Sequence, residues 1–274
     1  MTPPLTTDGS LIAAEKPCAI PDLALPRTWK ILVLAPHPDD FDAIGVTLKH
    51  LARNGHAIAL GVVRTGSGVE DAYRPGLTLA DKADLREQEQ RRSLQFFGLP
   101  PEALTVLRLT NDADDQPIDC PENGALIAAF VRAQTPEIVC LPHGNDTNNG
   151  HRVMYALLKQ AARGSGHPLA LLLIRDPKTI EMRTDVYMPF DQADAEWKSR
   201  LLRCHDSQHH RNLRTRNHGF DDRILTLNRE IARGLSLAHE YAEAFELECD
   251  NVPRTGNGSL ITAFRPQSPE GPST

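Results

Sequence analysis

Short apolar runs alternate with longer periodic segments along most of the chain. Continuous apolar runs, typical of strands buried on both faces of a parallel sheet, lie at residues 31–35, 57–63, 105–109, 137–141 and 169–174. Between them, apolar residues spaced three or four apart predict a helix at residues 41–55. Further helices are predicted at residues 79–97, a charged segment that ends at Gly98, at 124–134, an apolar segment, and at 153–163. Strands that alternate with helices predict right-handed βαβ units, and therefore an α/β fold with a mostly parallel sheet.

The pattern weakens toward both ends of the chain. Residues 1–28 contain five of the 21 prolines and show no clear period, which predicts an extended N-terminal arm over the domain surface. Three further elements are predicted in the last third of the chain, two helices and one short element, at residues 193–204, 224–235 and 241–248. Residues 254–274 predict a C-terminal tail, which leaves 29–253 as a single domain without internal repeats.

The composition is that of an ordinary globular protein, with 40% hydrophobic and 24% charged residues. A formal net charge of −6 gives no global attraction to nucleic acids or anionic membranes. No apolar run approaches the roughly 18 residues of a membrane span, and the first residues lack the pattern of a secretory signal. The five cysteines form no Cys-x-x-Cys pair, which favours free thiols in a reducing compartment and predicts a cytoplasmic protein.

The first candidate for chemistry follows the first predicted strand. The sequence Pro-His-Pro-Asp-Asp places His37, Asp39 and Asp40 at the carboxyl end of that strand, where open α/β sheets bind ligands. An imidazole and two carboxylates can hold one divalent metal and leave one carboxylate as a base. The alternative is a proline-punctuated loop whose two acids cap the next helix.

A second polar segment, PHGNDTNNGHR at residues 142–152, follows a later predicted strand. Because parallel strands end at the same edge of a sheet, the two segments are expected to share one site. His151 could be a third ligand beside the first histidine and aspartate, which is the pattern of an open, catalytic zinc site. His151 could equally be a residue that merely begins a helix. His143 and Asp146 are candidates to orient a ligand or the water, although Asp146 also suits an Asx turn.

These two segments resemble the motifs of the PIG-L/LmbE-like deacetylases. The resemblance rests on Ala-Pro-His-Pro-Asp-Asp and, about a hundred residues later, on Pro-His-x-x-Asp-Thr-x-x-x-His-Arg. It covers most of residues 29–248, with support from Arg86-x-x-Glu89, His205-x-Ser207-Gln208 and Tyr241-Ala-Glu-Ala-Phe245. The resemblance implies a Rossmann-like three-layer fold and a zinc-dependent hydrolase that removes the N-acetyl group from N-acetylglucosamine-type sugars.

Matched residue by residue, the resemblance implies that His37, Asp40 and His151 bind the metal and that Asp39 is the general base. The metal would lower the pKa of a bound water toward about 7 and polarise the amide carbonyl, and Asp39 would accept the proton of the water. Zinc is the implied ion, although Fe²⁺ or Mn²⁺ would tolerate the same two histidines and one aspartate.

The resemblance also implies a set of substrate-facing residues, expected to be Arg86, Asp146, His205 and Gln208. Arg86 corresponds to a substrate-facing position, and the alternative is that it forms a surface ion pair with Glu89. His205 and Gln208 lie near positions that line the site in the family, without a defined role. The expected partner is thus a small acetylated amino sugar, and a homo-oligomer is compatible with the sequence.

The chain departs from the family pattern at Phe41 and at residues 148–150. Phe41 stands where the family usually has a glutamate, and Asn148-Asn149-Gly150-His151 replaces a His-Pro-Asp-His run. The replacement removes a histidine thought to protonate or polarise the substrate carbonyl and the aspartate that orients it. Asn148 could still donate a hydrogen bond to an oxyanion, although it cannot act as an acid. His143 or His205 could take the place of the missing histidine.

Two functions of other kinds stay open. The missing histidine and aspartate suggest a binding protein that kept the fold and the metal but lost the chemistry. Clustered aspartates and histidines also serve metal-dependent phosphoesterases, although two-metal sites need a bridging carboxylate and more ligands than are evident here.

Three further segments offer weaker signals. The glycine-rich residues 64–68 favour a mobile loop at the edge of the site, and the acidic turn 111–117 resembles a calcium loop only loosely. Residues 203–218 carry four arginines but no interleaved aromatic residue, which argues against nucleic-acid binding. His205 and His209 could share a second metal on a helix, but a solvated or substrate-facing rim is favoured, and its arginines would suit an acidic or phosphorylated sugar.

Overall fold

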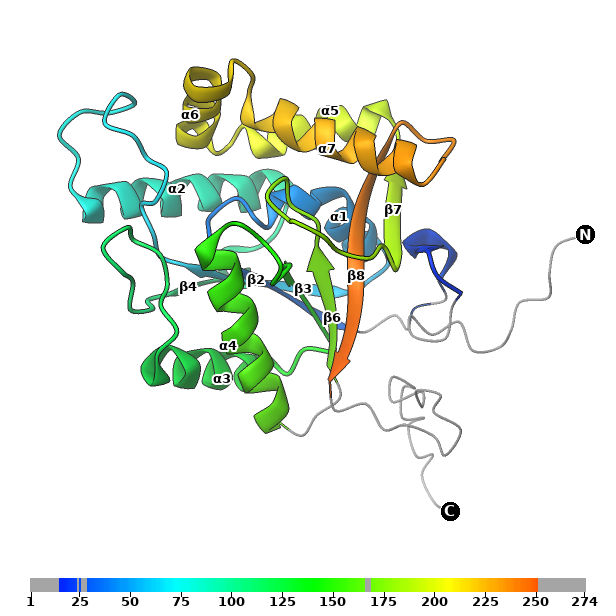
Figure 1. Cartoon of the computed structure of the whole chain (residues 1–274), viewed down its shortest axis with the longest axis horizontal. Coiled ribbons are helices and arrows are strands. Elements are labelled where there is room, and N and C mark those ends of the chain that lie inside the picture. Colours follow the sequence, from blue (N-terminus) through cyan, green and yellow to red (C-terminus); the bar gives the residue numbers. More distant parts are fainter. Residues whose placement is uncertain (1–14, 24, 26–28, 166–168, 251–274) are drawn as a thin grey trace, which may run out of the picture.

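An eight-stranded sheet forms the centre of the molecule in this computed structural model, which describes residues 15–23, 25, 29–165 and 169–250 (Figure 1). The strands are β1 (Cys18–Ala19), β2 (Lys30–Ala35), β3 (Ala57–Val63), β4 (Leu104–Leu107), β5 (Ile138–Pro142), β6 (Leu169–Ile174), β7 (Val186–Phe190) and β8 (Tyr241–Asp250). Their order is β1-β7-β8-β6-β5-β2-β3-β4. Only the pairs that β8 makes with β6 and β7 are antiparallel. The predicted α/β fold with a mostly parallel sheet is confirmed.

Helices cover both faces of the sheet. They are α1 (Gly45–Arg53), α2 (Leu79–Phe97), α3 (Pro121–Gln134), α4 (Asn149–Ser165), α5 (Gln192–Leu202), α6 (Asp206–Arg216) and α7 (Phe220–Gly234), with single 3₁₀ turns η1 (Ile20–Asp22), η2 (Asp42–Ile44) and η3 (Pro101–Ala103). Figure 1 shows α3 and α4 on one side of the sheet and α1, α2, α5 and α7 on the other. The described residues therefore form three layers.

The buried strand β2 shows how the sequence builds these layers. All five residues from Ile31 to Ala35 are buried, which explains the continuous apolar run. Because side chains alternate along a strand, Ile31 and Val33 pack with α1, whereas Leu32 and Leu34 pack with α3 and α4. The two apolar clusters lie on opposite faces of one sheet, so the turn after β2 emerges between two packed layers.

Several elements differ from the sequence-based prediction. Part of the segment predicted as an N-terminal arm, 1–28, adds the edge strand β1 to the sheet, beside β7. Neither β7 nor α6 was predicted as a separate element, and the predicted helix at residues 41–55 begins instead with one 3₁₀ turn. The predicted tail, 254–274, lies outside the described residues. No helix in the described part of the chain is long and apolar enough to cross a membrane.

A buried ion pair fastens the start of α1 to the sheet. Glu243, on β8, accepts hydrogen bonds from the backbone nitrogens of Val46 and Thr47 at 3.1 and 2.7 Å. Its Oε1 lies 2.7 Å from Nζ of Lys198, which also donates to the carbonyl of Ala43. Both charged side chains are almost completely buried. The pair thereby fixes the backbone that follows the Pro-His-Pro-Asp-Asp turn.

We expect Glu243→Gln to destabilise the protein by about 3–5 kcal/mol, because it leaves the ammonium group of Lys198 buried without its carboxylate. Urea denaturation followed by circular dichroism measures this change. The control is Glu240→Gln, which breaks the exposed pair with Arg229 and should change stability by no more than about 1 kcal/mol. Equal effects of the two substitutions would contradict a stabilising role for the buried pair.

Candidate active site

The turn between β2 and η2 carries the first group of candidate side chains. After Ala35 the backbone leaves the sheet, and the carboxylate of Asp40 accepts a hydrogen bond from the backbone nitrogen of His37 at 2.8 Å. Asp39 adopts φ = 128°, a backbone conformation that is strained for a residue other than glycine and persists only when its surroundings enforce it. The backbone nitrogen of Asp39 donates to Oε1 of Gln90 at 3.2 Å. The turn is therefore held by α2 as well as by its own carboxylate.

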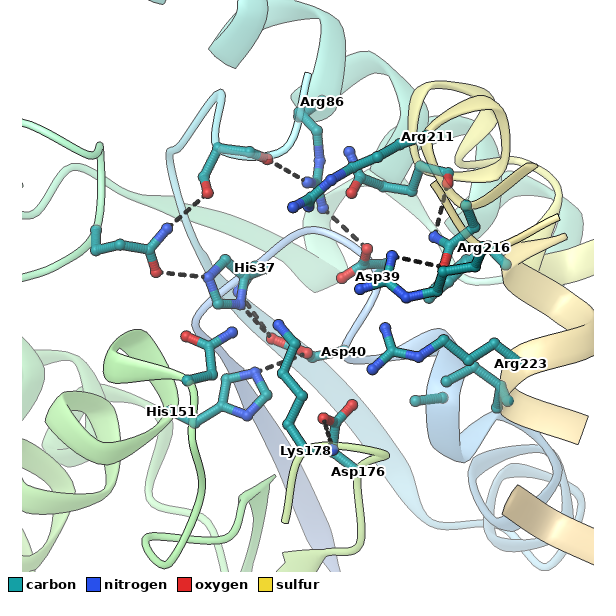
Figure 2. Close-up of a pocket in the computed structure, with 18 residues that line it drawn as sticks. His37, Asp39, Asp40, Arg86, His151, Asp176, Lys178, Arg211, Arg216 and Arg223 are labelled. Atoms are coloured by element: carbon teal, nitrogen blue, oxygen red, sulfur yellow. Dashed lines mark hydrogen bonds and ion pairs between the residues drawn. The ribbon is translucent and has the colours of Figure 1, made fainter. Parts of the chain in front are cut away.

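His37, Asp40 and His151 converge at the carboxyl edge of the sheet (Figure 2). One ligand atom from each of them lies within 4.8 Å of the others, and all three residues are buried. Nδ1 of His37 lies 3.4 Å from Oδ2 of Asp40, and Nε2 of His151 lies 3.5 Å from Oδ1 of the same carboxylate. Two imidazole nitrogens and one carboxylate oxygen fit a divalent metal such as zinc with an open fourth position. The convergence expected from the two sequence motifs is present.

The charges of this cluster are strongly coupled. Burial alone would raise the pKa of Asp40, but the charge of His151 and hydrogen bonds from both histidines hold it far below its usual range. Burial would lower the pKa of His151, yet Asp40 and Asp146 together raise it to about 10. Without a metal, the positive charge of a protonated His151 balances the negative charge of Asp40. A metal ion that binds at Nε2 would have to displace the proton from that nitrogen.

Asp146 orients the imidazole of His151. Its Oδ2 lies 3.1 Å from Nδ1 of His151, and its Oδ1 accepts a hydrogen bond from the backbone nitrogen of Asn148 at 2.6 Å. The second contact is an Asx-type turn, so both alternatives considered for Asp146 are found in one side chain. A carboxylate behind the ring fixes which nitrogen faces the cluster. Asp146 does not line the pocket in the position expected of a substrate-facing residue.

Gln116 orients the imidazole of His37, as Asp146 orients that of His151. Its Oε1 lies 2.8 Å from Nε2 of His37, and its Nε2 donates to Oγ of Ser67 at 2.6 Å. Because an amide oxygen only accepts, Nε2 of His37 is the donor in this contact, and Nδ1 is the nitrogen that faces Asp40. A Cβ atom at Gly150 would come within 2.6 Å of that amide oxygen. The glycine that replaces the family's aspartate thus makes room for a glutamine from another loop.

Arg86 lies beneath the turn and holds Asp39. Its guanidinium is 2% exposed and lies 3.1 Å from Oδ2 of Asp39. It also donates to the backbone carbonyls of Pro38 and Ser67. Burial raises the pKa of Asp39, and the opposing charge of Arg86 does not fully offset this effect. Arg86 lines the pocket, but the contacts of its two terminal nitrogens are to the protein itself.

The alternative of a surface pair between Arg86 and Glu89 is wrong, because both residues are buried and face different partners. Glu89 accepts hydrogen bonds from the backbone nitrogen and hydroxyl of Ser207 at 2.7 and 2.8 Å. These contacts tie α2 to the start of α6. The Arg-x-x-Glu spacing therefore reflects two separate anchors that support the site from one helix.

His143 and His205 lie outside the pocket lining. Nε2 of His205 is 2.5 Å from Oδ2 of Asp42, and both side chains are fully buried. Nδ1 of His143 accepts from the backbone nitrogen of Asn145, and its ring stacks on Tyr155. Neither histidine occupies the place of the one missing from the motif. His209 pairs with Asp221 at 3.2 Å. Among the described residues, two groups could hold a metal ion, His37–Asp40–His151 and Asp146–His151–Asp176, and His209 belongs to neither.

The pocket itself has a volume of about 310 Å³. Of the residues expected to act there, His37, Asp39, Asp40, Arg86, Asn148, His151 and Gln208 line it. The sequence did not single out several other lining residues, namely Ser67, Gln116, Asp176, Lys178, Arg211, Asn212, Arg216, Phe220, Arg223 and Ile224. Arg211 and Arg216 belong to the arginine-rich segment 203–218, which the sequence predicts as a solvated or substrate-facing rim. That prediction is the sequence signal that could have identified them.

The acidic turn at 111–117 serves the site indirectly. Asp115 accepts hydrogen bonds from the backbone nitrogen of Gly66 at 2.5 Å and from the hydroxyl of Thr65 at 3.2 Å. These contacts join the turn to the glycine-rich loop. The carboxylates of this turn belong to no metal-ligand group among the described residues, so a calcium site has no support there. The turn instead presents Gln116 to His37.

We expect Gln116→Leu to raise the dissociation constant for Zn²⁺ about 10- to 100-fold, because the variant no longer fixes the ring of His37. Gly150→Ala should weaken binding similarly, since its Cβ would displace the Gln116 amide, and the double variant should be less than additive. Competition with a chromophoric chelator measures the constants.

The matched control is Gly164→Ala on the same helix, where a Cβ atom would meet nothing within 4 Å. It should leave the zinc affinity unchanged. Wild-type affinity in Gln116→Leu would contradict the proposed support of His37.

Comparisons with known proteins concern the family and the fold. Residues 32–162, which contain both motifs, match the PIG-L family model, described as GlcNAc-PI de-N-acetylase. No curated protein matches the chain.

Solved structures share the fold. GalB, the 4-carboxy-2-hydroxymuconate hydratase from Pseudomonas putida KT2440, matches with a TM-score of 0.60 at 20% identity, over 83% of this chain and 98% of its own. N,N'-diacetylchitobiose deacetylase from Pyrococcus horikoshii matches with a TM-score of 0.65 at 18% identity, over 80% and 83%. The A40926 pseudoaglycone deacetylase Dbv21 matches with a TM-score of 0.59 at 18% identity, over 81% and 98%. Residues 32–162 therefore match the PIG-L family, and these solved structures show that the fold of the chain is shared.

Proposed function

We propose that this protein is a metal-dependent hydrolase that removes the N-acetyl group from an N-acetylglucosamine-type sugar conjugate. The observation that carries the proposal is the cluster of His37, Asp40 and His151 with a further carboxylate, Asp39, beside it in the pocket. The match of residues 32–162 to a family described as GlcNAc-PI de-N-acetylase supports this reaction and substrate class. Zinc is the proposed ion, since the donor set is that of an open zinc site.

In the proposed reaction, the metal ion activates water and the substrate carbonyl, and protein side chains transfer the proton. A divalent ion held by His37, Asp40 and His151 would lower the pKa of water and polarise an amide carbonyl. Asp39 is the proposed general base, because it lies in the pocket and is not one of the three clustered ligands. Its ion pair with Arg86 fixes the direction of its carboxylate. After the carbon–nitrogen bond breaks, Asp39 would return the proton to the leaving amine.

Asn148 is the proposed donor for the developing oxyanion. Its Oδ1 accepts a hydrogen bond from the backbone nitrogen of Gly150 at 3.0 Å, which orients the amide group. No hydrogen bond from its Nδ2 is found to any other described residue, and Asn148 lines the pocket. An amide donor can stabilise an oxyanion but cannot transfer a proton. Asp39 would therefore serve as both base and acid.

A binding protein without catalysis is the second candidate, because the family's histidine and aspartate are replaced by Asn148 and Gly150. The test is acetate release from a panel of N-acetylglucosamine conjugates, with added Zn²⁺ and with chelated protein as control. Metal-dependent acetate release would support the hydrolase. Retained metal with no release from any conjugate would favour the binding protein, and cleavage of a generic phosphoester would favour a phosphoesterase.

We expect Asp39→Asn to bind Zn²⁺ as tightly as the wild type but to lose turnover by about 100- to 10,000-fold, since an amide cannot accept the proton. Acetate release at saturating substrate gives the rate, and metal analysis of the purified variant gives the occupancy. Unchanged turnover would refute the assignment of Asp39 as the base.

His151→Ala should instead lose metal, because it removes one of three clustered ligand atoms. Metal content after dialysis against a weak chelator measures the loss, and His239→Ala, at an exposed position far along the chain, is the control. Full occupancy in His151→Ala would exclude this residue from the ligand set.

A further inference from the structure

Positive charge gathers on one side of the pocket. Figure 2 shows Arg216 and Arg223 reaching into it from the side opposite His37 and His151. Arg211 and Lys178 line the same pocket. Since the chain as a whole has a net charge of −6, this concentration of cations is not a consequence of overall composition.

Most other arginines of this region have carboxylate partners. Arg214 forms two hydrogen bonds with Glu70, at 2.6 and 2.8 Å, and Arg203 pairs with Asp221 at 2.8 Å. Arg211 approaches Glu70 only at 3.9 Å. By contrast, Arg216 contacts two neutral side chains, Asn212 and Thr215.

No ion pair of Arg216, Arg223 or Lys178 is found among the described residues. Partial burial lowers the pKa of Arg216, and the positive charge of Arg223 lowers it further. The two guanidinium groups therefore repel one another on the same side of the pocket. An anion bound between them would remove this repulsion and gain hydrogen bonds from planar donors.

The positions of Arg216 and Arg223 on their helices indicate which of the two has a structural reason to be there and which does not. Arg216 ends α6, where a cation interacts favourably with the helix dipole, so its presence alone needs no ligand. Arg223 lies in the first turn of α7, where a cation is unfavourable. Its half-buried side chain turns into the pocket rather than toward a carboxylate. Arg223 is therefore the residue whose placement calls for an anionic ligand.

We propose that the substrate carries an anionic group, a phosphate or a carboxylate, which binds between Arg216 and Arg223 with Lys178 on the adjoining wall. The inference rests on the proposed function and narrows it to acidic conjugates of N-acetylglucosamine. The acetamide would lie at His37, Asp40 and His151, and the anion at the other side of the same pocket. Both phosphate and carboxylate oxygens accept bidentate hydrogen bonds from guanidinium groups.

The first experiment compares three substrates that differ in one group. They are N-acetylglucosamine 6-phosphate, N-acetylglucosaminyl glycolate with its carboxylate, and neutral methyl N-acetylglucosaminide. Acetate release by the zinc-loaded protein should show a kcat/KM for one or both anionic substrates about 10- to 100-fold above that of the neutral one. The preference should decrease as salt is raised. The ratio of the two anionic substrates identifies which anion the pocket prefers.

The second experiment removes the two arginines. Arg216→Gln/Arg223→Gln should abolish the preference by raising KM for the anionic substrates, with kcat and the neutral substrate little changed. Arg200→Gln/Arg233→Gln removes the same charge from exposed positions on α5 and α7 and should keep the preference. This control separates a local site from a change in overall charge. Urea denaturation verifies that both double variants fold.

Calorimetric titration with inorganic phosphate and with glycolate makes the test independent of turnover. Equal acetate release from all three substrates, unaffected by the arginine variant, would overturn the anion site and leave the deacetylase intact. No acetate from any substrate, with anion binding that is lost only in Arg216→Gln/Arg223→Gln, would overturn the deacetylase and leave the anion site. Absence of both acetate release and anion binding would overturn both.

Discussion

The contact between Arg86 and Asp39 is the constraint on which the geometry of the pocket depends. A guanidinium that is 2% exposed needs partners for its buried donors, and its two terminal nitrogens find them at Asp39 and at two backbone carbonyls, whereas its Nε has no hydrogen-bond partner among the described residues. One carbonyl belongs to Pro38 in the turn after β2, and the other to Ser67 in the loop after β3. A single side chain from α2 thus joins two strand ends and holds Asp39 at φ = 128°. Removing it would free both loops and the backbone strain together.

A second layer of buried polar contacts supports this arrangement. Asp42 pairs with His205 at 2.5 Å and accepts a hydrogen bond from Ser93. Glu89 anchors the start of α6 through Ser207. These contacts connect α2, η2 and α6 behind the pocket, so the helix that carries Arg211 and Arg216 is positioned by the same elements that hold Asp39. The cluster of His37, Asp40 and His151 and the cationic side of the pocket are therefore held by one connected set of buried contacts.

The sequence predicts the features that depend on local pattern. Continuous burial of β2 and β5 appears as apolar runs, and the motifs at their carboxyl ends place His37, Asp40 and His151 at one sheet edge. It predicts less well what depends on tertiary contacts. Arg86-x-x-Glu89 has the spacing of a surface pair, and only the packing of α2 buries both residues against separate partners. Likewise, α6 has little apolar periodicity, because its buried residues, Ser207, Gln208 and Asn212, are polar.

The departure at Gly150 has a physical explanation that the motif alone could not supply. An aspartate there would occupy the space of the Gln116 amide, which lies 2.8 Å from Nε2 of His37. The space beside His37 and Gly150 is therefore filled by an amide group from a separate loop. That loop is joined through Asp115 to the glycine-rich loop beside Arg86. Because these loops share hydrogen bonds, the orientation of His37 depends on the same backbone that holds Asp39. Gln116 thus couples His37, a proposed metal ligand, to Asp39, the proposed base, through hydrogen bonds between these loops.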